Sequence, residues 1–135
     1  MLIRKTSSAS SSSQSDRARA CAKAALDKQA IEPVLLDLTQ SGSYTDYLLI
    51  ASAQAERGVT AIAEHVIETM QAQGAKLLGV EGLREGRWAL IDFGDIVVHV
   101  FLDSLREFYD LEGLWFDAPR VPLPEAPARR TEAWM

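Results

Sequence analysis

The feature that most constrains the fold is a pair of apolar runs separated by only two residues. The runs span residues 87–92 and 95–102, and Phe93-Gly94 lies between them. Two-residue connections that contain glycine are typical of tight β-hairpins. The register fixed by this turn pairs Asp92 with Asp95, Leu90 with Val97 and Trp88 with His99. The sequence therefore predicts a β-hairpin over residues 87–102.

Alternation of side chains along each strand assigns the residues of this hairpin to two faces. One face is purely apolar and is expected to be core: Ala89, Ile91, Ile96, Val98, Val100 and Leu102. The other, which we call the mixed face, combines aromatic, acidic and aliphatic residues: Trp88, Leu90, Asp92, Asp95, Val97, His99 and Phe101. Because two acids and a histidine make a poor core, we expect the mixed face to be a binding surface.

The remaining periodicity alternates between helix and strand. The expected elements are a helix from Ser15 or Asp16 to about Ile31, strands over 34–38, 46–52 and 77–81, and helices over 57–73 and 102–109. This order predicts an α/β (α+β) domain with a mixed β-sheet of about five strands. Helices are expected to pack mainly on one face of the sheet, which leaves the other face partly open around Trp88.

Composition divides the chain into a tail, a domain and a second tail. Residues 1–15 contain seven serines and no acid, a composition typical of disorder. Residues 16–118 form the predicted single domain, and residues 119–135 hold four of the five prolines, which indicates an extended tail. The basic residues of the first segment, among them Arg4, Lys5, Arg17 and Arg19, leave an organellar transit peptide as the alternative to a cytoplasmic protein.

The charge of the domain is strongly acidic. Residues 24–118 contain sixteen Asp and Glu against six Lys and Arg, a net of −10. A direct nucleic-acid reader needs clustered basic residues, so this balance argues against that class and favours a basic partner protein. A single cysteine excludes an internal disulfide, and no apolar run is long enough to predict a membrane span.

Catalytic and metal-binding patterns are weak. Cys21 lies in an alanine-rich helix, His65 lies on a helix face predicted to be solvated, and no HxxxH or CxxC spacing occurs. His99 could act as a base only if Asp92 or Asp95 held it, but the predicted register places both acids well along the strand. We therefore expect no catalytic residue, no metal site and no cofactor.

One segment is similar to the start of a nucleotidyltransferase site. Gly42-Ser43 precedes Asp46 and a strand, as in enzymes that place a glycine–serine pair before Asp-x-Asp or Asp-x-Glu. Two carboxylates are needed there to bridge two divalent cations. The second position here is Leu48, so a nucleotidyltransferase-like fold would lack the catalytic motif.

Three motifs then carry a family resemblance. They are T-D-Y-x-x-I-A-S after Ser43, E-G-x-x-E-G-x-W-x-L-x-D-x-G-D-x-V-V-H-V-F at 81–101, and R-x-F-Y-D-L-E-x-L-W-x-D-A-P at 106–119. With the intervening helix they cover about residues 17–119, and on them the chain resembles the ribosomal silencing factor family, also called Iojap-related. Residues 53–58 depart from the family pattern, since Arg57-Gly58 replaces a usual Arg-Gln pair.

The resemblance implies a non-enzymatic repressor of translation with a nucleotidyltransferase-like fold. Members bind the large ribosomal subunit through ribosomal protein fourteen and block joining of the small subunit when nutrients are short, and they can also form homodimers. The expected contact residues are Trp88, Asp92, Asp95, Val97, His99, Phe101, Tyr109, Leu111, Glu112 and Trp115. Trp88 is the expected anchor, because buried Trp, Tyr and Arg tend to dominate interface energies. The alternatives are a homodimerisation module without a ribosomal role and a residual nucleotidyltransferase.

Overall fold

Five strands form one mixed sheet, in a computed structural model that describes the backbone of residues 2–123 and the side chains of residues 14–123. The strands are β1 (Ile31–Asp37), β2 (Tyr47–Ala53), β3 (Gly79–Glu81), β4 (Trp88–Asp92) and β5 (Ile96–Leu102). Their order across the sheet is β1-β2-β5-β4-β3, with β2 and β5 parallel and the other neighbours antiparallel. The predicted α+β class with a mixed five-stranded sheet is confirmed.

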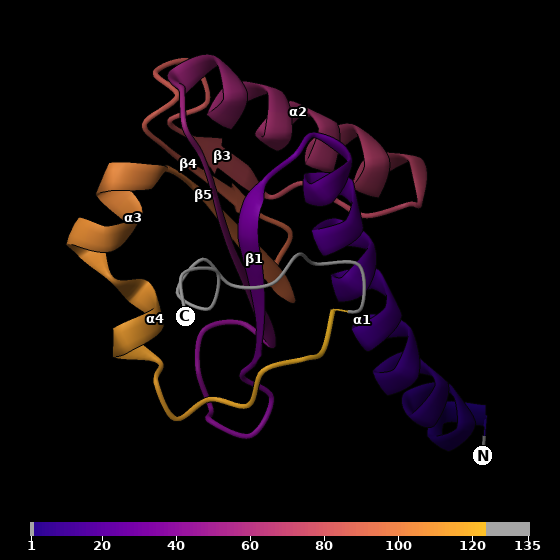
Figure 1. Cartoon of the computed structure of the whole chain (residues 1–135). Helices are drawn as coiled ribbons and strands as arrows, with labels where there is room; N and C mark the ends of the chain where they lie inside the picture. Colours follow the sequence, from indigo (N-terminus) through magenta and orange to yellow (C-terminus); the bar gives the residue numbers. More distant parts are fainter. Residues whose placement is uncertain (1, 124–135) are drawn as a thin grey trace.

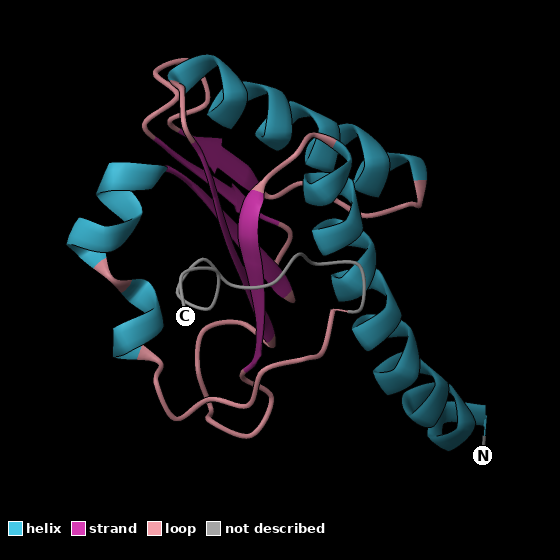
Figure 2. Cartoon of the chain, in the orientation of Figure 1, coloured by secondary structure: helices cyan, strands magenta, loops and turns pink. Residues whose placement is uncertain are grey.

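Two long and two short helices cover opposite faces of this sheet (Figures 1 and 2). The helices are α1 (Leu2–Asp27), α2 (Glu56–Ala72), α3 (Asp103–Tyr109) and α4 (Leu111–Leu114). The long pair packs on the apolar face of the hairpin, whereas α3 and α4 lie against its mixed face. None of the described helices is both long and apolar enough to cross a membrane.

The serine-rich segment differs from expectation. Helix α1 begins at Leu2, so the backbone before Ser15 is helical where the composition predicted a disordered tail. No glycine or proline interrupts residues 2–27, and serine is only a few tenths of a kcal/mol worse than alanine inside a helix. The buried alanines of the second half can therefore anchor a helix that continues towards the N-terminus.

The apolar face of the hairpin is core, as predicted. Ala89, Ile91 and Val98 are fully buried and pack with α1 and α2 in the larger of two apolar clusters. The second cluster lies on the other side of the sheet: Val34, Leu36, Leu38, Leu48, Ile50, Val97 and Phe101. The sheet thus has a core on each face, and the mixed face is less open than the sequence predicted.

The predicted hairpin register is wrong by two residues. Asp92 pairs with Val97, Leu90 with His99 and Trp88 with Phe101. Phe93 N–H donates to the Ile96 carbonyl at 2.9 Å, so the turn is Gly94-Asp95 instead of Phe93-Gly94. Gly94 has a φ of +92°, which a favoured two-residue hairpin turn requires at its first position. Because the slip is an even number of residues, every strand side chain keeps its predicted face.

The start of the C-terminal segment covers the outer edge of β1. Asp37 N–H donates to the Pro119 carbonyl and Val121 N–H to the Leu35 carbonyl, each at 2.8 Å. Val121 and Leu123 then pack against the larger core. Residues 119–123 are extended; the rest of the predicted proline-rich tail, including Pro124 and Pro127, lies outside the described residues.

Candidate partner-binding surface

The mixed face of the hairpin is largely covered by the chain itself. Val97 and Phe101 are buried in the second core, where Leu105, Leu111 and Trp115 pack against them. Val97, Phe101, Leu111 and Trp115, all expected contact residues, therefore serve first to attach α3 and α4 to the sheet. Trp88 and Leu90 remain half-buried at the uncovered side of this face, where they line a shallow hollow with Glu81 and Gly82.

Trp88 is the centre of an aromatic cluster that joins the hairpin to α3. Its ring centroid lies 4.8 Å from that of Phe101 and 4.7 Å from that of Tyr109. The indole N–H donates to Nδ1 of His99 at 3.0 Å, which fixes the orientation of the indole. Trp88 is thus held rigidly, with part of its surface accessible, as an interface anchor would be.

His99 is the polar member of this cluster. It is 7% exposed, and burial lowers its pKa from 6.5 to about 4. Since Nδ1 accepts the hydrogen bond from Trp88, the proton of the neutral ring resides on Nε2. Nε2 is buried and finds no hydrogen-bond partner in the described part of the chain. His99 therefore orients Trp88 as a neutral acceptor, and no hydrogen bond to an acid is found for it among the described residues.

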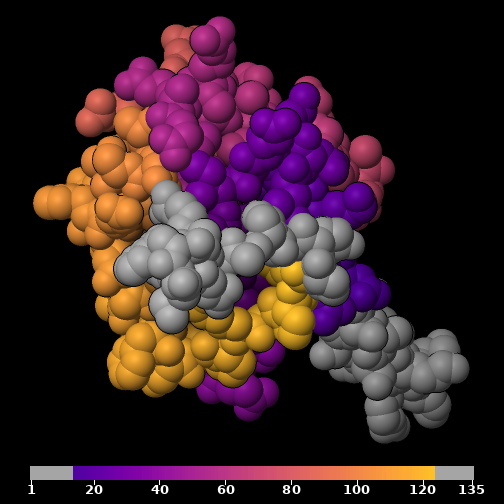
Figure 3. All heavy atoms as spheres, viewed as in Figure 1, coloured from indigo at the N-terminus to yellow at the C-terminus, as the bar shows by residue number. Residues whose placement is uncertain are grey.

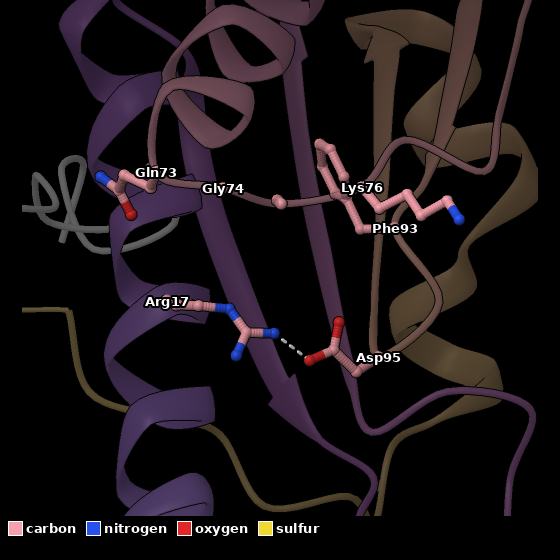
Figure 4. A pocket seen from close by; sticks show the side chains of 7 residues that line it. Arg17, Gln73, Gly74, Lys76, Phe93 and Asp95 are labelled. Atoms are coloured by element: carbon pink, nitrogen blue, oxygen red, sulfur yellow. Dashed lines mark hydrogen bonds and ion pairs between the residues drawn. The ribbon is translucent and has the colours of Figure 1, made fainter.

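The two acids of the mixed face have separate roles. Asp95 lies in the turn, and its carboxylate pairs with Arg17 of α1 (Figure 4). Its placement on the mixed face is thus wrong, because the corrected turn directs it towards the long helices. Asp92 remains on that face, half-buried, and accepts a hydrogen bond from Gly94 N–H at 2.8 Å. Of the two, only Asp92 is placed to meet a partner there.

A hollow of about 350 Å³ lies beside the Arg17–Asp95 pair (Figure 4). Its lining residues are Arg17, Gln73, Gly74, Ala75, Lys76, Phe93 and Asp95. Arg17 is neutralised by Asp95, and the side chain of Gln14 donates to the neighbouring Asp46 at 3.0 Å. The two carboxylates at the starts of the parallel strands β2 and β5 are thus both bound by polar side chains of α1.

Catalytic candidates are similarly occupied or buried. Burial raises the pKa of the Cys21 thiol to about 12, with a further contribution from the Asp95 charge, so the nucleophilic thiolate is suppressed. Nε2 of His65 lies 3.2 Å from the Asp27 carboxylate on the surface. No group of three or more His, Cys, Asp or Glu side chains suited to a metal ion occurs among the residues whose side chains are described.

Three exposed apolar side chains of the α3–α4 region were not among the contact residues expected from the sequence. We call Phe108, Leu114 and Phe116 the outer ridge; their exposures are 76%, 68% and 82%. Tyr109, an expected contact residue, is 48% exposed and touches Phe108 edge-on at 5.0 Å between ring centroids. Because the ring of Tyr109 also contacts that of Trp88 in a tilted arrangement, ring contacts connect Phe108 of the ridge to the open side of the mixed face.

The surroundings of the outer ridge are acidic. Residues 103–117 contain five acids and a single base, Arg106, which is buried. Glu107, Asp110 and Asp117 are exposed, whereas Glu112, an expected contact residue, turns inward to Arg106 at 3.1 Å. Figure 3 shows this region forming one side of the molecular surface. An apolar ridge with acidic neighbours suits a partner that combines apolar and basic groups.

Comparison with known proteins decides the family. A family model described as "Ribosomal silencing factor during starvation" matches residues 10–134. This chain belongs to the ribosomal silencing factor family. The ribosomal silencing factor of Halalkalibacterium halodurans is 42% identical over 97 residues, which cover 72% of this chain and 83% of that protein.

A more distant relative and a solved structure are also similar to this chain. The chloroplastic Iojap protein of Zea mays is 31% identical over 103 residues, covering 76% of this chain and 45% of that protein. A crystal structure of a Chromobacterium violaceum protein superposes with a TM-score of 0.73 at 28% identity, covering 89% of this chain and 97% of that one.

Two glycines of the E-G-x-x-E-G motif at residues 81–86 have a steric role. Gly82 and Gly86 have φ values of +74° and +69°, which other residues rarely adopt. A Cβ atom would lie 2.0 Å from the Trp88 carbonyl oxygen at Gly82 and 2.4 Å from the Glu56 carbonyl oxygen at Gly86. The motif thus packs the loop before Trp88 tightly against β4 and the start of α2.

Proposed function

We propose that this protein binds the large ribosomal subunit through ribosomal protein fourteen and thereby keeps the small subunit from joining. Membership of the ribosomal silencing factor family supports a role on the ribosome. The observation that carries the proposal in this chain is the outer ridge, three strongly exposed apolar side chains among acidic residues. Ribosomal proteins are basic, so a protein component of the subunit fits this surface better than ribosomal RNA.

The proposed contact surface joins the outer ridge to Trp88. Phe108, Tyr109 and Trp88 are linked by ring contacts of 5.0 and 4.7 Å between centroids. Asp92 would add a charge that a basic side chain of the partner can approach. The buried members of the predicted set, Val97, His99 and Phe101, support this surface from below and would not touch the partner.

We propose a steric and non-enzymatic mechanism. The repressor would occupy the face of the large subunit that the small subunit must approach, so no bond needs to be made or broken. The segment around Asp46 that is similar to a nucleotidyltransferase site is consistent with a non-enzymatic mechanism. The Asp46 carboxylate accepts a hydrogen bond from Gln14, and Leu48 stands at the position of the second acid. Because similar ribosomal silencing factors are bacterial, we propose that the protein acts in a cytoplasm of bacterial type. Since a chloroplastic protein is also similar, an organelle is the alternative location.

Order of addition in a subunit-joining assay tests this function. Purified protein is incubated with either subunit at fixed magnesium, the other subunit is added, and joined ribosomes are quantified by light scattering. Incubation with large subunits should suppress joining in proportion to the protein added. Unchanged joining, or suppression only after incubation with small subunits, would contradict the proposal. If joining is unchanged and the apparent molecular mass of the protein in solution increases with protein concentration, the homodimerisation alternative gains support.

A further inference from the structure

Arg106 of α3 is a buried charged residue that contacts both α4 and the sheet. It is 4% exposed and donates to five acceptors. The acceptors are Glu112 Oε1 at 3.1 Å, Glu112 Oε2 at 3.2 Å, the Ile31 carbonyl at 2.8 Å, the Ser52 hydroxyl at 3.0 Å and the Glu32 carbonyl at 2.7 Å. A guanidinium has five N–H donors, so its full capacity is used.

These contacts connect segments that are distant in sequence. Ile31 and Glu32 begin β1, Ser52 lies in β2, and Glu112 lies in α4. The Ser52 hydroxyl also donates to Asp103 of α3 at 2.9 Å, which extends the network to the start of that helix. A single side chain therefore ties both short helices to the first two strands.

The backbone of β1 is distorted where Arg106 meets it. The pairing of β1 with β2 shifts register between Ile31 and Val34, and Glu32 has a φ of +41°. A non-glycine residue in the left-handed region is strained. The distortion accompanies the presentation of two consecutive carbonyls, those of Ile31 and Glu32, to the guanidinium, which indicates that strong hydrogen bonds to Arg106 offset the strain.

The apolar packing of the short helices on the sheet is incomplete. In α3 and α4, both fully within the described residues, Arg106 is the only buried residue. Leu105, Leu111 and Trp115 pack on the sheet but remain partly exposed. Helices of seven and four residues are not stable alone, and Asp110 separates them in the left-handed conformation. Their placement therefore depends on the hydrogen bonds of Arg106 as well as on this partial apolar packing.

We propose that Arg106 is a positioning residue that presents the outer ridge to the partner. It holds α3 and α4 against the sheet so that Leu111 and Trp115 face inward while Phe108, Leu114 and Phe116 face outward. The part of this inference that concerns partner binding rests on the proposed function; the part that concerns the helices does not.

Hydrogen exchange of the free protein tests the positioning role without any ribosome. Arg106→Met keeps much of the side-chain length but removes every donor. Amides of residues 103–115 should then exchange roughly ten- to hundredfold faster, the range expected for lost hydrogen bonds to a charged group. Amides of α2 and β5 should keep their protection. Arg87→Met is the matched control, since Arg87 is exposed and pairs loosely with Glu56 at 3.8 Å.

Two outcomes of the exchange experiment would overturn the positioning role. Unchanged exchange in residues 103–115 would show that apolar packing alone holds the helices. An equal increase throughout the chain would show a general loss of stability. If Arg106→Met does not fold, Glu112→Gln serves instead, because it removes the counter-charge and leaves the carbonyl acceptors; faster exchange confined to 103–115 is again expected.

Binding to large subunits tests whether the positioning serves the partner. If Arg106 acts by presenting the ridge, Arg106→Met and Phe116→Ala should weaken binding less than additively in combination. Arg106→Lys should restore little affinity, since a lysine cannot reproduce the planar fork of donors. Additive effects, or full rescue by lysine, would contradict the role in binding. If the unsubstituted protein does not bind at all, the proposed function fails while hydrogen exchange still decides the positioning role.

Discussion

Removing Phe116 should weaken ribosome binding and leave the fold intact. Its side chain is 82% exposed, so Phe116→Ala takes away few contacts within the folded protein. Full burial of a phenylalanine side chain stabilises by about 1.5–3 kcal/mol. If the partner covers the surface now exposed, the loss is about 1.2–2.5 kcal/mol, which corresponds to a roughly eight- to seventyfold higher Kd.

The assay is a titration of fluorescently labelled protein with purified large subunits at constant salt and magnesium. Leu78→Ala is the matched control, because Leu78 is also exposed, at 58%, but is not part of α3 or α4 and directly precedes the edge strand β3. Urea unfolding of both variants should give midpoints close to that of the unsubstituted protein.

Two results would refute this reasoning. A Kd for Phe116→Ala within about twofold of the unsubstituted value would remove the outer ridge from the interface, since a buried phenylalanine is worth more than that. An equal loss in Leu78→Ala would show that exposed apolar groups contribute without regard to position. The first result would favour Trp88 and the open side of the mixed face as the contact surface instead.

Three further predictions concern stability and reactivity. Folding lowers the pKa of His99 from 6.5 to about 4, so as the pH falls the unfolded chain takes up this proton at a higher pH than the folded protein does. The free energy of unfolding should therefore fall by roughly 3 kcal/mol as the pH drops from above 6.5 to about 4. With its pKa raised to about 12, the Cys21 thiol should not react with a disulfide reagent at pH 8 until the protein is unfolded. Gly86→Ala should destabilise by at least about 1 kcal/mol more than Gly74→Ala, since both need a left-handed residue but only at Gly86 would the added Cβ clash with a carbonyl.

Each of these has a clear contrary result. Urea unfolding between pH 4 and 7 should show a shallower pH dependence in His99→Gln, which keeps an acceptor for Trp88 but does not titrate; an unchanged slope would exclude His99 as the cause. Rapid labelling of native Cys21 would show that α1 opens readily. Equal unfolding midpoints for the two glycine variants would mean that the loop at Gly86 can move away from Glu56.

The faces of the hairpin could be predicted from sequence although its register could not. Alternation along a strand depends only on parity, so moving the turn from Phe93-Gly94 to Gly94-Asp95 left Trp88 and Ala89 on their predicted faces. Both positions offer glycine to the turn, and local sequence does not choose between them. The choice affected one site residue, Asp95, which belongs to the turn and pairs with α1.

The outward face of the last helices could not be predicted for a different reason. A helix of seven residues gives barely two turns of periodicity, and Asp110 then resets the phase by adopting a φ of +46°. Leu111 and Trp115 were therefore expected at the contact surface, whereas the structure turns them inward and leaves Phe108, Leu114 and Phe116 exposed. The hydrogen-bond partners of Arg106 could not be predicted either, because two of them are backbone carbonyls more than seventy residues away in the sequence.

Co-sedimentation with isolated ribosomal subunits tests the central claim most directly. Purified protein is mixed separately with large and small subunits at fixed magnesium and centrifuged through a sucrose cushion. Saturable recovery with large subunits only, lowered in Phe116→Ala and retained in Leu78→Ala, is the predicted result. Recovery with neither subunit, or equally with both, in a sample shown to be folded would contradict the account.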